Sequence, residues 1–545
     1  MDNSLDKVVK CARCLAIFMI LVSSCIALLL TSNAEGEFLN NDAPRHALNG
    51  VFVKDFLTAL PLLNAKDWAV RYYLQYPSLT ILFYPPLFYF VEAAFFGVFG
   101  VSNFIAQASI TLFILLLAIS SYALAREFLP RWSSLGVAMM CIGAPEVAFW
   151  GRQVMLDIPA FALLASGAYF TVRYIRHARS LDVYFAVLLV LAAIYTKYNA
   201  GFIAPVLAVT FLVARGRMVL RDRHALAAGA LGIVGSLPAL YMVKHFGQVN
   251  IASIAGRPGD LKVTTLDAWL YYGKLLPGEL GWIGFGLAVV GLGLVLTHRT
   301  NASTRWGIVL TVGWFLFGYV FFSSISLREG RSVLVLLFPL ALWAAMALDW
   351  ALPRKMSQAA VLLLGVGTFL LGLFDSAPPA WAGYREVADY VAGHAARDAV
   401  VLYSGYRDGN FVFNLRTHEE RRDITTVRAD KLLLHITVER VRGVSQASYS
   451  EEEIAKLLNE LGVSLVVYQP GFWEDLEQMV RLGDVLHSSR YRRVQEIPLI
   501  GYKGSNDGPA IEIYEPVAMP AGPRRALDIE IGIVGERFST GTKAP

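Results

Sequence analysis

Long apolar runs recur along the first two thirds of the chain and constrain its fold more than any other feature. A helix inside lipid satisfies its own backbone hydrogen bonds, so runs of this kind fold as spanning helices. Because only 17% of the residues are charged, we expect an α-helical polytopic membrane protein. About eleven runs are long enough to cross roughly 30 Å of hydrocarbon, at residues 13–31, 104–125, 133–150, 158–175, 182–197, 199–214, 225–243, 280–297, 306–325, 332–350 and 357–374.

A twelfth apolar segment, residues 86–100, begins with Pro85-Pro86 and contains Glu92, so hydropathy alone does not decide whether it crosses. Lys and Arg in short loops mark the cytoplasmic side of a membrane. If the segment does not cross, the basic loops all fall on that side: Arg126 and Arg131; Arg173, Arg176 and Arg179; Arg215, Arg217, Arg221 and Arg223; Arg299 and Arg305; Arg354 and Lys355. We therefore expect residues 32–103 to form one long external loop, in which 86–100 is a juxtamembrane or re-entrant helix.

The amino-terminal segment has the layout of a signal peptide, with basic residues before an apolar run at about residues 15–30. Ser32-Asn33-Ala34 would be a tolerable cleavage site. We favour a retained first span. In either case, the residues that follow lie outside.

The composition changes abruptly after Phe374, which predicts a transmembrane domain at residues 1–375 and a second domain at 376–545. Residues 400–403, 464–468 and 511–514 have the pattern of buried strands, and residues 451–461 that of an amphipathic helix. We therefore expect a small soluble α/β domain, on the periplasmic or extracellular side of the cytoplasmic membrane. Within it, Arg421-Arg422-Asp423 is interpreted as a solvated turn.

The predicted topology leaves a short set of charged residues near the outer ends of the spans. A charge well inside the bilayer costs roughly 2.5–3.5 kcal/mol, so its presence requires a partner or a function. Simpler interpretations exist: a solvated Asp42, a Lys197 that extends to the interface, and a structural turn at residues 328–331. The set comprises Asp42, Arg45, His46, Arg152, Asp157, Lys197, Lys244, His245, Arg328, Glu329 and Arg331.

Two carboxylates and several cations on one face of a helical bundle are the side chains needed to transfer a chemical moiety away from a lipid phosphate. A carboxylate can act as general base toward an acceptor hydroxyl or amine. The cations can stabilise the charge that develops on the departing phosphate. Asp42 and Asp157 are the candidate catalytic residues, and Lys197, Arg328 and Arg331 the candidate phosphate-binding residues. Supporting roles are assigned to Arg45, His46, Arg152, Glu329 and His245.

At these residues the sequence resembles the GT-C glycosyltransferases, in particular the glycosyltransferase 39 group related to protein O-mannosyltransferases and to the aminoarabinose transferase of lipid A. The resemblance covers about residues 10–375. It rests on the order and spacing of several motifs: the acidic residue of the first loop, Tyr84-Pro85-Pro86-Leu87-Phe88-Tyr89, residues 152–159, Tyr195 to Asn199, and residues 328–331 before Pro339.

The resemblance implies a polyprenyl-phosphate sugar as donor and catalysis on the external face. Asp42 matches the catalytic Asp of the family's first loop, Asp157 its second-loop acidic residue and Lys197 its donor-phosphate lysine. The match of Arg328 and Arg331 to phosphate-binding residues of the family is less specific. The family commonly has Asp-Glu in the first loop, whereas Ala43 follows Asp42 here, so any role of the second acid is lost or passes to Asp157 or His46.

The leading hypothesis is an inverting glycosyltransferase that transfers a hexose or pentose from a polyprenyl-phosphate carrier to a lipid, glycan or protein acceptor. The alternative is a non-catalytic transporter or scaffold for lipid-linked envelope intermediates. We expect membrane lipids as partners and no nucleic acid. Carboxylates and histidines are too sparse to fix a coordination set, so the sequence leaves the participation of a divalent metal open.

Overall fold

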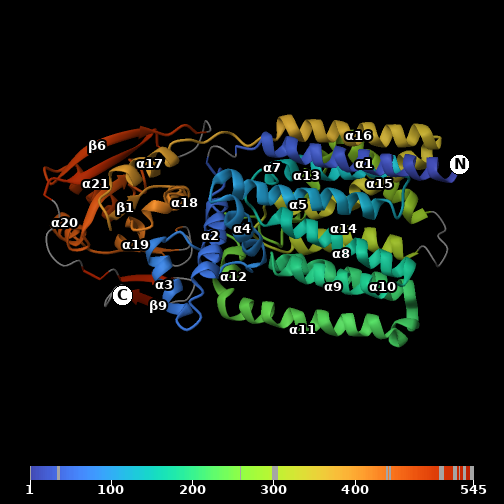
Figure 1. Ribbon diagram of the computed structural model, residues 1–545, viewed down its shortest axis with the longest axis horizontal. Coiled ribbons are helices and arrows are strands. Elements are labelled where there is room, and N and C mark those ends of the chain that lie inside the picture. Colours follow the sequence, from blue (N-terminus) through green and yellow to red (C-terminus); the bar gives the residue numbers. More distant parts are fainter. Residues whose placement is uncertain are drawn as a thin grey trace.

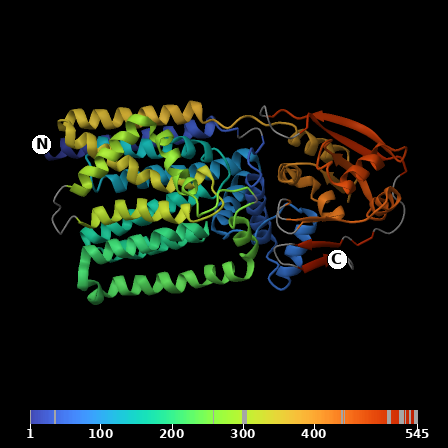
Figure 2. The same cartoon turned by 180° about the vertical axis from the view of Figure 1, so that it is seen from behind.

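The computed structural model describes residues 2–33, 37–257, 259–297, 305–436, 440, 443–501, 508–518, 525–526, 528–531 and 536–539. Figure 1 shows a bundle of long helices joined by a linker to a smaller part that contains β-sheet, and Figure 2 shows the same arrangement from behind. Ala34 of the candidate cleavage site and Arg299 of a predicted basic loop lie outside the described residues.

The bundle contains the predicted apolar runs as helices that lie side by side (Figure 1). Leucines on α11, such as Leu237, and residues on the second half of α13, such as Trp282, point outward, and such apolar surface requires lipid around it. The chain is thus a multi-pass membrane protein. The elements are α1 (Asp2–Leu30), α5 (Asn103–Ala125), α6 (Arg131–Gly143), α7 (Pro145–Trp150), α8 (Asp157–His177), α9 (Ser180–Ile194), η1 (Tyr198–Phe202), α10 (Ile203–Arg215), η2 (Gly216–Arg221), α11 (Arg223–Phe246), α12 (Gln248–Ile254), α13 (Leu266–Thr297), α14 (Arg305–Ser323), η3 (Gly330–Leu336), α15 (Leu337–Ala351) and α16 (Arg354–Asp375).

Nine of the described helical segments are long and apolar enough to cross a membrane. Two of the eleven predicted runs are shorter in the structure. The run at 133–150 is interrupted at Ala144, whose ψ of 136° is extended, because the residue before a proline avoids the helical region and Pro145 has no N–H to donate. The run at 182–197 gives α9, which has 15 residues. The predicted span at 280–297 is the second half of α13, which kinks at Gly281 (φ 68°).

Two pairs of glycines bring α6 and α16 into backbone contact. A Cβ on Gly365 would lie 2.3 Å from the carbonyl oxygen of Gly136, and a Cβ on Gly372 would lie 2.1 Å from that of Gly143. Small residues at these positions allow close helix packing, which is a main source of helix association inside a bilayer. This contact holds the carboxyl end of α16 beside the turn that follows α7.

A layer of short helices covers the end of the bundle that faces the sheet-containing part (Figure 1). It consists of α2 (Ala43–Ala59), α3 (Ala65–Gln75) and α4 (Leu87–Phe99). The 13 residues of α4 extend about 20 Å at 1.5 Å per residue, which is less than a full span, and α4 packs against α2. The segment expected at 86–100 is therefore a short helix beside the bundle end.

The carboxyl-terminal part is the predicted α/β domain. Its main sheet has the order β2-β1-β5-β7-β6, in which β1 is parallel to β2 and β5, and β7 is antiparallel to β5 and β6. The predicted strands at 400–403, 464–468 and 511–514 and the helix at 451–461 are confirmed. The elements are α17 (Tyr384–His394), β1 (Val400–Ser404), α18 (Asp408–Thr417), η4 (Glu419–Arg421), β2 (Thr425–Arg428), α19 (Ala429–Leu433), β3 (Leu434–Ile436), β4 (Val444–Gln446), α20 (Glu451–Glu460), β5 (Val463–Tyr468), α21 (Glu477–His487), β6 (Tyr491–Pro498), β7 (Ala510–Pro516), β8 (Asp528–Ile531) and β9 (Glu536–Ser539).

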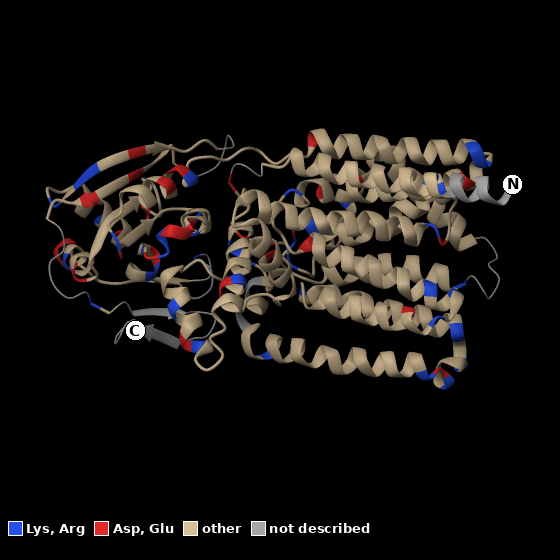
Figure 3. Ribbon diagram, in the orientation of Figure 1, with Lys and Arg blue, Asp and Glu red and all other residues tan. Residues whose placement is uncertain are grey.

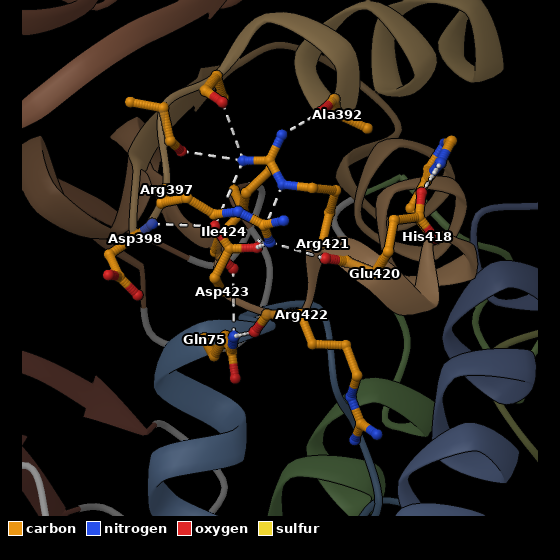
Figure 4. A network of polar contacts seen from close by, with 12 residues as sticks. Gln75, Ala392, Arg397, Asp398, His418, Glu420, Arg421, Arg422, Asp423 and Ile424 are labelled. Atoms are coloured by element: carbon orange, nitrogen blue, oxygen red, sulfur yellow. Dashed lines mark hydrogen bonds and ion pairs between the residues drawn. The ribbon is translucent and has the colours of Figure 1, made fainter.

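The interpretation of Arg421-Arg422-Asp423 as a solvated turn is wrong. Arg421 donates to the carbonyl oxygens of Ala395 and Ala396, each at 2.9 Å, as well as to that of Ala392 (Figure 4). Its guanidinium also pairs with Asp423 at 3.2 Å. Arginine presents five N–H donors, so one side chain satisfies several carbonyls at the end of α17. A periodicity argument cannot detect this arrangement, because the acceptors lie 25 or more residues away along the chain.

Charged side chains are distributed unevenly along the bundle. Lys and Arg gather at the end far from the sheet-containing part, where the amino terminus also lies (Figures 1 and 3). Arg176 is in the last turn of α8, Arg215 is in the last turn of α10, and Arg354 begins α16. The predicted basic loops thus share one end of the bundle, and the candidate site residues lie at the opposite end.

Candidate active site

Three candidate residues from distant parts of the sequence meet at the end of the bundle. Asp157 is the first residue of α8, Lys197 precedes η1, and Arg331 lies in η3. The Nζ atom of Lys197 is 2.6 Å from Oδ1 of Asp157, and Nη1 of Arg331 is 3.7 Å from Oδ2. All three side chains are at most 13% exposed. We refer to Asp157, Lys197 and Arg331 as the active-site cluster.

Further contacts hold Arg331 in this position. Its Nε donates to Oε2 of Glu329 at 2.6 Å, and its guanidinium lies over the Trp150 ring, 5.4 Å from the centroid. Lys197 and Arg331 together carry eight N–H donors, and Asp157 and Glu329 use only some of them. The cluster therefore retains donor capacity for an oxyanion.

A cavity of about 340 Å³, open solvent included, adjoins the cluster. Asp157 and Phe161 line it one turn of α8 apart, and Leu164 follows one turn further into the bundle. Residues three to four positions apart share one face of a helix, so the lining of α8 changes from charged to apolar with depth. The remaining lining residues are Ala160, Lys197, Asn199, Ala200, Phe202, Phe322, Arg331, Ser332, Leu334 and Val335.

Asp42 lies at the start of α2 and differs from Asp157 in its surroundings. It is partly exposed, its side chain does not cap the helix, and its carboxylate has no hydrogen-bond or ion-pair partner among the described residues. His46, one turn further along α2, is 3% exposed, and its Nδ1 is 2.9 Å from the Tyr89 hydroxyl. Burial lowers the pKa of His46 to about 4, against the opposing effect of Asp42. His46 is therefore neutral at physiological pH.

Several residues at this site were not singled out as site residues by the sequence analysis. The Tyr84 ring is 5.4 Å from that of His46, and Tyr84 begins the segment 84–89 that carries part of the family resemblance. Glu146 accepts a hydrogen bond of 2.6 Å from Nε1 of Trp150, the ring beneath Arg331. A Cβ on Gly330 would lie 2.6 Å from Oε1 of Glu146. The helix break at Pro145 is the sequence signal that could have indicated Glu146.

Other candidates turn away from the cluster. Arg328 donates to the backbone carbonyls of Ala268, Leu261, Ser326 and Ser323 at 2.6–3.1 Å. Exposed His245 contacts the carbonyl of Tyr241, one turn back on α11. Arg45 pairs with Asp408 of the carboxyl-terminal part at 2.8 Å. Arg152 is buried and donates to the carbonyls of Gly372 and Leu373. None of these four lines the cavity beside the cluster.

The active-site cluster does not have the donor set of a divalent metal site. Such ions are held by several carboxylate or carbonyl oxygens, whereas Asp157 is the only carboxylate among the described residues that line the cavity, and two cations already compensate its charge. Among the described residues, no group of three or more His, Cys, Asp or Glu side chains could hold a metal ion.

Comparisons with known proteins show which proteins this chain is similar to. A family model described as dolichyl-phosphate-mannose-protein mannosyltransferase matches residues 84–242. The matched range begins at Tyr84 and includes Asp157 and Lys197. A comparison with curated proteins gives no match.

Two crystal structures of ArnT from Cupriavidus metallidurans share the fold. The structure bound to undecaprenyl phosphate has a TM-score of 0.61 and 16% identity over 94% of this chain and 99% of that chain. The apo structure has a TM-score of 0.61 and 14% identity over 96% and 100%. The chain therefore has the fold of ArnT. The resemblance to the GT-C glycosyltransferases that the sequence motifs indicated is confirmed.

Proposed function

We propose that this protein is an inverting glycosyltransferase that transfers a hexose or pentose from a polyprenyl-phosphate sugar to an acceptor at the outer face of the cytoplasmic membrane. One observation carries the proposal. Lys197 and Arg331 lie beside the start of α8, and the cavity that they line becomes apolar toward the bundle interior. A polyprenyl phosphate has the matching distribution, with an anionic group at the end of an apolar chain. The similar ArnT crystal structure contains undecaprenyl phosphate, which supports this ligand class.

Lys197 and Arg331 are assigned to the donor phosphate. Arginine and lysine form charge-assisted hydrogen bonds to phosphate oxygens. Asp157 holds both cations in position through the contacts of 2.6 and 3.7 Å. Because its charge is compensated, we assign it a positioning role and not that of the base.

Asp42 is assigned the role of general base, since its side chain is partly exposed and its carboxylate has no partner among the described residues. In the proposed step the acceptor oxygen or nitrogen attacks the anomeric carbon and forms the new glycosidic bond. The bond from that carbon to the phosphate oxygen breaks, and the phosphate leaves with the electron pair. The acceptor proton passes to Asp42. A single displacement of this kind inverts the anomeric configuration.

The proposed orientation follows from charge. The basic loops at the far end of the bundle (Figure 3) are expected in the cytoplasm. This orientation would bring the active-site cluster and the sheet-containing part to the outer side. Lipid, glycan and protein acceptors fit the chemistry equally well.

The proposal is tested by sugar transfer in proteoliposomes supplied with labelled polyprenyl-phosphate sugars. Asp42→Asn is expected to slow transfer about 10²–10⁴-fold, the usual contribution of a general base. Asp67→Asn, which changes an exposed carboxylate in the same loop region, is the matched control and should transfer at the wild-type rate.

Two results would count against the proposal. Full turnover by the Asp42→Asn protein would remove Asp42 from the mechanism. Movement of the labelled lipid across the bilayer by the wild-type protein, with no transfer to any acceptor class, would instead favour the transporter alternative.

A further inference from the structure

A second cavity lies between the bundle and the linker to the carboxyl-terminal part, and it shares no lining residue with the cavity beside the active-site cluster. It encloses about 320 Å³, open solvent included. Four separate segments form it: the chain after α1, the beginning of α5, the turn between α7 and α8, and the linker before α17. We call it the junction cavity. Its lining residues are Asn33, Glu37, Phe38, Leu39, Asn103, Gln107, Arg152, Gln153, Pro378 and Pro379.

Arg152 is the cation of the junction cavity, and most of its hydrogen-bonding capacity is unused. Its side chain is 3% exposed. Nη2 donates to the carbonyl oxygens of Gly372 and Leu373 at 3.1 and 2.7 Å, in the last turn of α16. Nε and Nη1, which carry three N–H bonds between them, have no hydrogen-bond partner among the described residues. A buried guanidinium in this state is costly unless something pairs with it.

No carboxylate of the described residues forms an ion pair with Arg152. Burial is the cause that lowers the pKa of Arg152, to about 10, and no nearby acidic group offsets it. The carbonyl oxygens at the end of α16 are the partial negative charges that hold the guanidinium. The position of the guanidinium is therefore fixed, and no acidic side chain among the described residues compensates its charge.

Gln153 and Glu37 contribute further unused polar atoms. Both amide atoms of Gln153, which is 4% exposed, have no partner among the described residues. Oε1 of Glu37 accepts from the backbone N–H of Arg385 at 2.6 Å, whereas Oε2 is unpartnered. Burial raises the pKa of Glu37 to about 8, so at neutral pH its carboxyl group is largely protonated and can donate. Gln107 is held in place by its bond to the carbonyl of Gly151.

We infer that the junction cavity is a second oxyanion site, in which Arg152 and Gln153 bind a phosphate ester. A phosphate has several acceptor oxygens, which match the unused N–H groups of Arg152 and the amide of Gln153. Phe38, Leu39 and the two linker prolines supply apolar lining, as the carbon portion of an ester requires. The phosphate can come from a phospholipid headgroup or from a soluble phosphate, because the chemistry is the same.

The same turn of chain supplies both sites. Arg152 and Gln153 face the junction cavity, and Asp157 four residues later belongs to the active-site cluster. The buried residues Val154, Met155 and Leu156 separate them. The inference does not depend on the proposed transferase activity, since it rests on the unpartnered groups of a different cavity.

The test measures phosphate binding in a background where the active-site cluster is disabled. Full-length Lys197→Met protein in phosphate-free detergent is titrated with inorganic phosphate by calorimetry. In this background we expect phosphate to bind, and Arg152→Gln to weaken binding about tenfold or more, the usual loss for a charge-assisted bond. Gln153→Leu should weaken it about threefold to tenfold. Because the Gln153 side chain bonds to no described residue, this variant should fold normally if Arg152→Gln does not.

A second arm distinguishes the sources of phosphate. Protein is released from nanodiscs of phosphatidylcholine, with and without phosphatidylglycerol, and retained lipid is counted by native mass spectrometry. Loss of retained phospholipid in Arg152→Gln and Gln153→Leu identifies a lipid headgroup, whereas a loss confined to the calorimetric arm identifies soluble phosphate. Arg179→Gln, which changes an exposed arginine of the basic end, is the control. The inference would be overturned if neither substitution changed phosphate binding in the Lys197→Met background and neither changed the amount of retained phospholipid.

Discussion

Asp157 and Asp408 are both aspartates between two cations with side chains only 10% and 11% exposed, yet their surroundings differ. Oδ2 of Asp157 has no hydrogen-bond partner among the described residues, and its cations line a cavity. Both carboxylate oxygens of Asp408 are bonded, to Arg45 at 2.8 Å, Arg428 at 2.7 Å and the Ser78 hydroxyl at 2.5 Å. An ion cluster that has free hydrogen-bonding groups beside a cavity can bind a ligand. An ion cluster whose hydrogen-bonding groups are all occupied can only hold structural elements together.

Asp55 is the centre of a second buried ion cluster at the same contact between the first loop and the carboxyl-terminal part, and no residue that lines either cavity belongs to it. Its Oδ2 is 2.7 Å from Arg416 and 2.9 Å from Arg422, and it accepts from the Tyr72 hydroxyl at 2.9 Å. We refer to the groups around Asp55 and Asp408 as the docking interface. Because α2 carries Asp55 and Arg45 as well as His46, the docking interface fixes the helix that begins beside Asp42.

The largest expected effect is on the docking interface. Arg416→Met would leave Asp55 buried with less compensation, and breaking a buried ion pair in this way costs about 3–5 kcal/mol. We expect a clear fall in thermal unfolding temperature in detergent, measured by intrinsic fluorescence. The double variant Asp55→Leu/Arg416→Met should recover part of the loss, since neither charge then remains alone. An unchanged unfolding temperature in the single variant would contradict the structural role.

In the active-site cluster, removal of a cation should lower the catalytic rate and leave the stability of the fold nearly unchanged. Lys197→Met is expected to lower kcat/KM for sugar transfer about 10²–10³-fold, as expected when one group that stabilises developing charge is lost. The unfolding temperature should change little, because Arg331 still compensates Asp157. Lys244→Met, an exposed lysine at the end of α11, serves as the control. A large loss of stability without a loss of catalytic rate per folded molecule would place Lys197 with the docking interface instead.

Acid should weaken the docking interface through Asp408. Burial alone would raise the pKa of Asp408, but Arg428 and Arg45 lower it from 3.8 to about 2. A carboxyl group whose pKa is lower in the folded than in the unfolded state stabilises the folded protein at pH values above its unfolded-state pKa. This stabilisation is lost as the pH falls from about 4 to about 2. The shift corresponds to about 2 kcal/mol. The difference in unfolding temperature between wild type and Asp408→Asn should therefore narrow over this range; a constant difference would show that Asp408 does not titrate there.

The smallest effect is expected at Arg328, which the sequence could not distinguish from Arg331. Arg328 binds backbone carbonyls only, so Arg328→Gln should change the KM for the donor less than about threefold and the stability by about 1 kcal/mol. Arg331→Gln is the matched comparison and should raise the donor KM more strongly. The reverse order of the two KM values would return the phosphate-binding role to Arg328.

The sequence by itself determined the membrane-spanning class, the approximate boundaries of most apolar helices, the α/β character of the tail and the segments that carry the candidate site. These properties depend on local composition, summed over about twenty residues for a span or on alternation within a strand. The kink at Gly281 and the break at Ala144 required backbone geometry. The break at Ala144 and the 15-residue length of α9 reduced the set of full spans relative to the eleven predicted runs, whereas the kinked α13 still counts as a span.

Only the tertiary structure decided which charges meet. Lys197 reaches Asp157 from 40 residues away along the chain. Arg331, which lies in η3, joins them, whereas Arg328 precedes η3 and donates to backbone carbonyls. Arg152 and Arg45, which the sequence grouped with the site, bind α16 and Asp408 instead. Ion pairing depends on a few ångströms of separation between helices, and those distances are set by packing such as the glycine contacts of α6 and α16, which no local pattern encodes.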